Sequence, residues 1–158
     1  MSSPTARAVQ WLRPDEMVAW RSYVETNADL MAALERDLAS TGLDLGDYQV
    51  LVFLSETSAR TLRMCDLAGR LQLSPSGLTR RLDGLVRAGL VERRGSDTDR
   101  RVMLAALTPK GMRVLEESAP IHVASVRRRM IDLLDDEELQ VIATVFQKIR
   151  TALEDDPT

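Results

Sequence analysis

The side chains best suited to chemistry are arginines, and they gather in the middle of the sequence. Between Arg60 and Arg113 the chain has 12 Lys or Arg and 5 Asp or Glu residues, a net charge of +7. The rest of the chain carries −10, which leaves −3 for the whole protein. Because guanidinium groups bind phosphates and the edge of guanine, a basic segment between acidic ones is typical of a surface that binds a polyanion.

Residues 75–88 predict a short amphipathic helix inside this basic segment. On a helical wheel the apolar side, which we expect to face the core, carries Leu78, Leu82, Leu85 and Val86. The opposite side begins with the small Ser76 and has Arg80 one turn later. Small residues let the backbone approach a partner, arginine can bind guanine in the major groove, and Ser74, Ser76 and the first-turn N–H groups suit phosphate. The pattern favours a DNA-reading helix; the alternative is a solvated arginine face on a structural helix.

A hairpin is predicted directly after this helix. Gly89 is a typical helix stop, and the segments "LVERR" and "RVMLAAL" that follow are extended in character and separated by the polar "GSDTD". Asp97 and Asp99 in the turn could pair with neighbouring arginines and hold them extended. A cationic loop of this length suits insertion into a minor groove, and surface solubility is the alternative role for its arginines, which are Arg93, Arg94, Arg100 and Arg101.

Helices are predicted to position these two features. Before the hairpin the pattern predicts a long helix, a buried helix, an extended connector and a short helix, over residues 14–40, 47–57, 61–63 and 64–72. In the first of these, apolar residues recur at spacings of three and four, a seam that serves either the chain's own core or a second chain. Ser74 and Pro75 are suited to cap and open the helix that carries Arg80.

Two further helices are predicted after the hairpin. Thr108 and Pro109 predict the start of a helix that runs to about Leu134, although Gly111 leaves its capping box incomplete. Pro120 lies inside this helix, so we expect a kink or a local break near Ala119. The last helix should begin after Asp135, whose partner in a capping box is Glu138. The fold class is therefore mainly α with a small β-hairpin.

Several functional classes are excluded by the composition. A single cysteine, Cys65, rules out an intramolecular disulfide, and a single histidine, His122, with no clustered ligands gives no metal site. Cys65 lies next to the acidic Asp66 and is interpreted as a small structural residue. No signal peptide, membrane span, catalytic triad or glycine-rich phosphate loop is visible, so we expect a soluble, cytoplasmic protein that is not an enzyme and needs no cofactor.

The central stretch "LAGRLQLSPSGLTRRLDGLVRAGLVERRGSDTDRRVMLAALTPKG" resembles the winged-helix core of the multiple-antibiotic-resistance regulator (MarR) family. The resemblance rests on the serine-rich start of the helix at Leu73–Arg80, on Leu85–Val91, on the Asp99-Arg100-Arg101 motif and on Leu107–Gly111. It implies a winged helix-turn-helix at residues 46–107. It also implies a helical dimerisation region at residues 1–45 and 108–158, all within one compact chain.

The resemblance also implies function. It predicts a homodimeric transcriptional regulator, usually a repressor, that binds double-stranded DNA at a pseudo-palindromic operator and is released by a small ligand or by oxidation. Arg101 would enter the minor groove while Asp99 steadies it. Further DNA contacts would come from Arg100 and from the reading helix, with Ser76, Thr79 and Arg80 at base edges and Arg81 at phosphate.

The regulatory signal is less well defined by the sequence. Members of the family bind aromatic, anionic effectors between the dimer helices and the winged domain, where Trp20, Tyr23 and Tyr48 could line a pocket or simply pack. The operator and the regulated genes are not encoded in the sequence. Two alternatives stay open at this point, a winged-helix module that binds protein and a DNA-binding protein that responds to no ligand.

Overall fold

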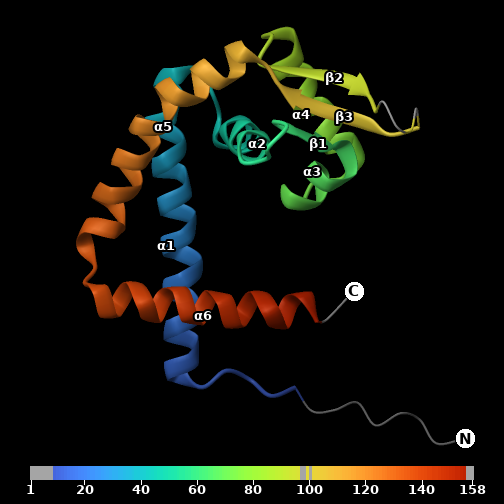
Figure 1. The fold of residues 1–158 in the computed structure, drawn as a ribbon. Helices are drawn as coiled ribbons and strands as arrows, with labels where there is room; N and C mark the ends of the chain where they lie inside the picture. Colours follow the sequence, from blue (N-terminus) through green and yellow to red (C-terminus); the bar gives the residue numbers. More distant parts are fainter. Residues whose placement is uncertain (1–8, 97–98, 100, 156–158) are drawn as a thin grey trace, which may run out of the picture. The chain divides into compact units, whose positions relative to one another are not determined.

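The computed structural model describes residues 9–96, 99 and 101–155 (Figure 1). The chain forms two compact units, Met1–Ala33 and Leu34–Thr158. Helices predominate, and the described strands form one small antiparallel sheet, which confirms the predicted fold class. None of the helices in the described ranges is long and apolar enough to cross a bilayer.

The first unit consists mainly of helix α1, which extends from Pro14 to Leu38 and so ends within the second unit. Pro14 occupies the first turn, where a missing N–H costs nothing. The preceding Arg13 forms ion pairs with Asp15 and Glu16 at 2.8 and 2.6 Å. The prediction of a long helix over 14–40 is confirmed, with its last turn tightened into a 3₁₀ helix at Ala39–Thr41.

The second unit contains a three-stranded sheet with helices packed on it. Its elements are α2 (Leu45–Ser55), β1 (Thr61–Arg63), α3 (Met64–Arg70), α4 (Pro75–Arg87), β2 (Val91–Gly95) and β3 (Met103–Leu107). The strand order is β1-β3-β2, with Val91 opposite Leu107 and Thr61 opposite Ala106. The hairpin is confirmed, and the connector over 61–63 proves to be the third strand.

Leucines from nearly every element of this unit build its core. Those with no measurable exposure include Leu38, Leu51, Leu54, Leu67 and Leu82. Helix α2 begins two residues earlier than predicted because the Asp44 side chain caps it, accepting a hydrogen bond from the Asp47 N–H at 2.6 Å. Helix α2 is thus capped by an aspartate and packs against β1, β3 and the helix at Pro109–Arg129.

Helix α5 (Pro109–Arg129) opens as predicted, with the Thr108 hydroxyl accepting from the Gly111 N–H at 2.9 Å. A side chain at Gly111 is sterically excluded, since an added Cβ would lie 2.1 Å from the Leu90 carbonyl oxygen. This explains the incomplete capping box. The helix continues unbroken through Pro120, so of the two predicted alternatives the local break is wrong, while the kink stays a prediction. The helix ends at Arg129 rather than near Leu134.

A 3₁₀ turn at Ile131–Leu133 leads to the last helix, α6 (Asp136–Glu154). The predicted capping box is confirmed. The Glu138 N–H donates to Asp135 Oδ1 at 2.9 Å, and the Asp135 N–H donates to Glu138 Oε2 at 3.0 Å. Helix α6 buries none of its residues in this chain.

Candidate nucleic-acid interface

Helix α4 presents its polar side to solvent and its apolar side to the core. Leu78, Leu82 and Leu85 are at most 2% exposed, while Ser76 and Arg80 are exposed. The Ser74 hydroxyl accepts from the Gly77 N–H at 3.1 Å and caps the helix, with Pro75 following it. The predicted cap and both faces are therefore confirmed, and the first turn of α4 is open to a partner.

Three side chains predicted to read base edges lie on this open face. The Ser76 hydroxyl is 3.1 Å from that of Ser74. The Thr79 hydroxyl donates to the Pro75 carbonyl at 2.9 Å, which leaves its oxygen free to accept. Arg80 has no hydrogen bond or ion pair to any residue in the described ranges, so its guanidinium is available to an external acceptor.

Arg81 differs from its neighbour, because its guanidinium is turned towards α2. Its Nη1 atom lies 2.5 Å from Asp44 Oδ1 and 2.8 Å from Asp47 Oδ1. Burial alone would lower the pKa of Arg81, but hydrogen bonds and charge from the two aspartates raise it instead. Burial, together with the charge of Asp44, raises the pKa of Asp47. The predicted phosphate contact is thus a residue whose charge is already neutralised inside the chain.

The arginines of β2 are also engaged within the chain. Arg93 donates to Asp83 Oδ1 and to the Thr79 carbonyl, both at 2.8 Å, and so ties β2 to α4. Arg94 donates to the Thr61 hydroxyl at 3.0 Å. The predicted partner Asp97 lies outside the described residues. Within the described residues the acceptors for Arg93 come from α4, because β2 packs beside that helix.

The turn of the hairpin holds the Asp99-Arg100-Arg101 motif. Asp99 Oδ1 accepts the backbone N–H of Arg101 at 2.9 Å, and the Val102 N–H donates to the Asp99 carbonyl at 2.9 Å. Asp99 and Arg101 are both exposed. Arg100 lies outside the described residues. Asp99 therefore fixes the backbone of Arg101, whose side chain stays exposed.

Contacts from α5 fix the other end of α4 and were not predicted. Lys110 Nζ donates to the Ala88 carbonyl at 2.7 Å, and the Thr108 hydroxyl donates to the Gly89 carbonyl at 2.7 Å. Gly89 has a φ of +72°, a left-handed conformation that favours glycine. The start of α5 therefore anchors the C-terminal end of the helix that carries Arg80. The only sequence signal for this contact is the general preference of a lysine for the carbonyl groups at a helix C-terminus.

The predicted effector residues fall in different units. Trp20 and Tyr23 lie on α1 in the first unit, are exposed, and have ring centroids 6.1 Å apart. Tyr48 belongs to the second unit, where it is buried against the His122 ring at a centroid distance of 4.6 Å. Burial lowers the pKa of His122. Tyr48 is therefore a core residue of its own unit.

Cys65 corrects another prediction. It is exposed, with its Sγ atom 3.5 Å from Asp66 Oδ1, so it is not a packing residue of the core. No group of three or more His, Cys, Asp or Glu side chains within the described residues is arranged to hold a metal ion.

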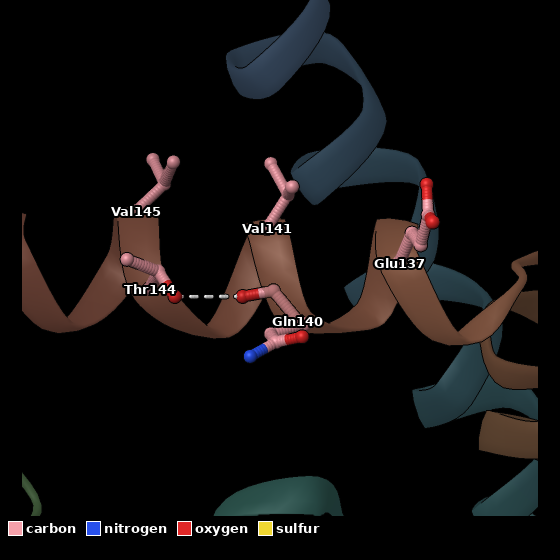
Figure 2. Close-up of a pocket in the computed structure, with 5 residues that line it drawn as sticks. All are labelled: Glu137, Gln140, Val141, Thr144 and Val145. Atoms are coloured by element: carbon pink, nitrogen blue, oxygen red, sulfur yellow. Dashed lines mark hydrogen bonds between the residues drawn. The ribbon is translucent and has the colours of Figure 1, made fainter.

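A second surface of note lies along α6. Apolar side chains recur there at every fourth position, namely Val141, Val145, Ile149 and Leu153. They are 60%, 47%, 48% and 72% exposed. Figure 2 shows Val141 and Val145 projecting from one face of the helix. Together with Glu137, Gln140 and Thr144 they line an open surface pocket of about 520 Å³. A stripe of this kind is typical of a helix that packs against another chain.

Comparison with known proteins extends these observations. Residues 41–102 match the sequence model of the MarR family. The HTH-type transcriptional repressor YetL of Bacillus subtilis is 29% identical over 119 residues, which are 73% of this chain and 71% of YetL.

Solved structures match over nearly the whole chain. AbsC, a MarR family transcriptional regulator from Streptomyces coelicolor, is 39% identical with a TM-score of 0.90, over 94% of this chain and 100% of AbsC. Sco3205 from the same organism, solved in complex with DNA, is 32% identical with a TM-score of 0.89, over 95% and 94%. CouR from Rhodococcus jostii RHA1, bound to p-coumaroyl-CoA, is 27% identical with a TM-score of 0.73, over 85% and 92%.

Proposed function

The chain belongs to the MarR family of transcriptional regulators, and on that premise we propose that it is a homodimeric repressor that binds a pseudo-palindromic operator. The family's members regulate transcription and are not enzymes, so no catalytic role is proposed. The solved relative Sco3205 binds DNA, and the curated relative YetL is a repressor.

The observation that supports this proposal is the exposed first turn of α4, a helix that Arg93 of β2 ties to the hairpin. We propose that α4 enters the major groove, with Ser76, Thr79 and Arg80 at base edges and Ser74 at a phosphate. The side chain of Arg101 would enter the adjacent minor groove, where the negative potential favours arginine. Asp99 would act indirectly by fixing the backbone of Arg101, and Arg100 would contact phosphate.

The homodimer is proposed from α6. Helix α6 is unburied and exposes four regularly spaced apolar side chains to water. Covering them with a second copy would stabilise the dimer by roughly 25 cal/mol for each Å² of apolar surface removed from water. Two copies on one face of the duplex would place their α4 helices about 34 Å apart, one turn of DNA. The acidic terminal helices then need not touch the DNA.

We further propose that a small aromatic or anionic compound releases the DNA. The support comes from CouR, whose bound p-coumaroyl-CoA is both aromatic and anionic, and from the exposed rings of Trp20 and Tyr23. Titration of such compounds into the protein–DNA complex should release DNA and change the tryptophan fluorescence. A complex that resists all of them, with no spectral change, would favour a regulator that responds to no ligand.

A binding assay on the intergenic DNA beside the protein's own gene tests the main proposal. The wild type should bind as a dimer with a steep dependence on salt, since each neutralised phosphate releases counterions. Arg80→Ala and Arg101→Ala should each weaken binding by about 5- to 150-fold, the equivalent of about 1–3 kcal/mol. Arg36→Ala, an exposed arginine outside the basic segment, is the matched control. Equal affinity of Arg80→Ala and Arg36→Ala would overturn the assignment of α4.

A further inference from the structure

We propose that Arg81 is a positioning residue that holds α4 against the first turn of α2, and that it does not contact DNA. The inference rests on the proposed DNA-binding function of α4. It reverses the role predicted for Arg81 from the sequence and gives different tasks to two adjacent arginines. We call the four residues involved, Asp44, Gly46, Asp47 and Arg81, the α2–α4 clasp.

The geometry of the clasp joins two elements far apart in the sequence. One nitrogen of Arg81 donates to both Asp44, 37 residues away, and Asp47, 34 residues away. The side chains of Arg81 and Asp47 are 28% and 26% exposed. Asp44 is also the cap of α2. A shift of α4 along or away from α2 would therefore break charged hydrogen bonds at a helix N-terminus.

The clasp requires a glycine at position 46, because a side chain there would collide with the guanidinium of Arg81. A Cβ atom built there would lie 2.4 Å from Arg81 Cζ and 2.6 Å from its Nη1. The guanidinium therefore lies flat over the Gly46 backbone, in space that any side chain would occupy. Gly46, Asp44 and Asp47 together form a fitted site for the Arg81 guanidinium, whereas a loose surface ion pair would not require a glycine.

The electrostatics of the clasp argue against a phosphate contact. Two carboxylates face one guanidinium, so the cluster carries a net charge of −1 and would repel a phosphate. Arg80 is rotated by about 100° around the helix and has no acceptor in the described part of the chain. One turn of α4 thus offers Arg80 to an external partner and commits Arg81 to the α2–α4 clasp.

Positioning matters because base edges are read at short range. Bidentate contacts between an arginine and guanine need the helix to be placed within about 0.5 Å. The opposite flank of α4 is held by Arg93 through Asp83 and the Thr79 carbonyl. Arg81 supplies the matching restraint on the α2 side, so loss of the clasp should weaken the specific complex without removing a phosphate contact.

Gly46→Ala is the decisive variant because it displaces the Arg81 head and changes no charge. The atoms that must move are the far end of a flexible side chain, so the fold should survive. Gly69→Ala is the matched control, since a Cβ at Gly69 meets nothing within 4 Å. Affinity for the operator and for unrelated duplex DNA should be measured against salt for both variants and for Arg81→Ala, together with their melting temperatures.

The clasp predicts that Gly46→Ala and Arg81→Ala lower operator affinity about tenfold, while affinity for unrelated DNA and the salt slope stay at wild-type values. Loss of a phosphate contact would instead reduce the slope by about 0.9 in Arg81→Ala and would overturn the inference. So would a lower melting temperature of Gly46→Ala with operator affinity unchanged. If the wild type bound no operator, the proposed function itself would fail first, and the inference with it.

Discussion

Helices α4 and α6 are both amphipathic and both capped at their N-termini, yet they treat their apolar faces in opposite ways. Helix α4 buries Leu78, Leu82 and Leu85 in its own chain, whereas α6 buries nothing. The polar face of α4 carries Arg80, which has no partner among the described residues, while one face of α6 carries an exposed apolar stripe. One helix is complete as folded and offers chemistry outward. The other leaves its apolar stripe exposed, and we propose that a second copy of the chain covers it.

This difference gives the charge distribution a physical meaning. The basic segment contains the helix that finishes its packing inside the chain. Arg81, Arg93 and Arg94 are engaged within the chain, whereas the exposed Arg80 and Arg101 are the arginines proposed to serve a polyanion. The acidic remainder belongs to helices that would meet their own copies and not the DNA. Variants on the two helices should therefore separate folding, assembly and DNA binding.

The largest effect is expected from charging the stripe on α6. Val145→Asp with Ile149→Asp should abolish the dimer, because two desolvated carboxylates per chain would be buried at the interface. Operator affinity should then fall about a thousandfold, towards the level of non-specific binding. Sedimentation and DNA titration would measure both effects. Gln147→Asp, on the polar side of α6, is the control, and a double variant that stayed dimeric would contradict the role given to α6.

A fully buried leucine of α4 should show the opposite behaviour. Leu82→Ala should lower the free energy of unfolding by about 2–5 kcal/mol through lost burial and a cavity, as urea denaturation would show. Leu153→Ala on α6, at a side chain that is 72% exposed, should change the stability of the monomer by less than about 0.5 kcal/mol. Similar losses of unfolding free energy in the two variants would contradict the proposed difference between the two helices.

The cap of α4 should have a smaller effect on stability. Ser74→Ala removes the acceptor of the Gly77 N–H and should cost about 1 kcal/mol, measurable by thermal or urea unfolding. Ser74→Asp keeps an acceptor and should keep the stability. Because it adds a negative charge where a phosphate would lie, it should still weaken DNA binding, and undiminished binding would remove Ser74 from the interface.

The smallest effect concerns pH and His122, which packs against the Tyr48 ring. Burial lowers the pKa of His122 below its ordinary value of 6.5, so the unfolded chain binds this proton more readily than the folded one. Its contribution to stability is present above pH 6.5 and is lost as the pH falls from there towards the lowered value. The melting temperature should drift downward over that window. His122→Phe should flatten the drift, and an unchanged profile would assign it to other groups.

Local patterns in the sequence were sufficient for both helices but not for their surroundings. Ser74 as a cap, the Asp135–Glu138 box and the hairpin strands follow from side chains within a few residues of one another, and the structure has all three. The clasp does not follow from such patterns, because Arg81 and Asp44 meet only after α2 and α4 have packed.

Steric facts were equally hidden. The sequence marks Gly111 as a defect in a capping box, whereas the structure shows that the Leu90 carbonyl occupies the space of its side chain. The third strand, Thr61–Arg63, was readable only as extended, since its pairing with β3 depends on residues more than 40 positions away. The exposed stripe on α6 has the same pattern as a buried one, so periodicity alone could not tell whether its own chain covers it.

The central claim is that two copies of this chain present their α4 helices to successive major grooves on one face of DNA. Affinity for duplexes that carry two operator half-sites at varied separation tests it most directly. The account predicts tight binding at about 10 base pairs between centres and a loss of about a hundredfold or more when 5 base pairs are inserted, because half a turn moves one site to the opposite face. Equal affinity at both separations would contradict it.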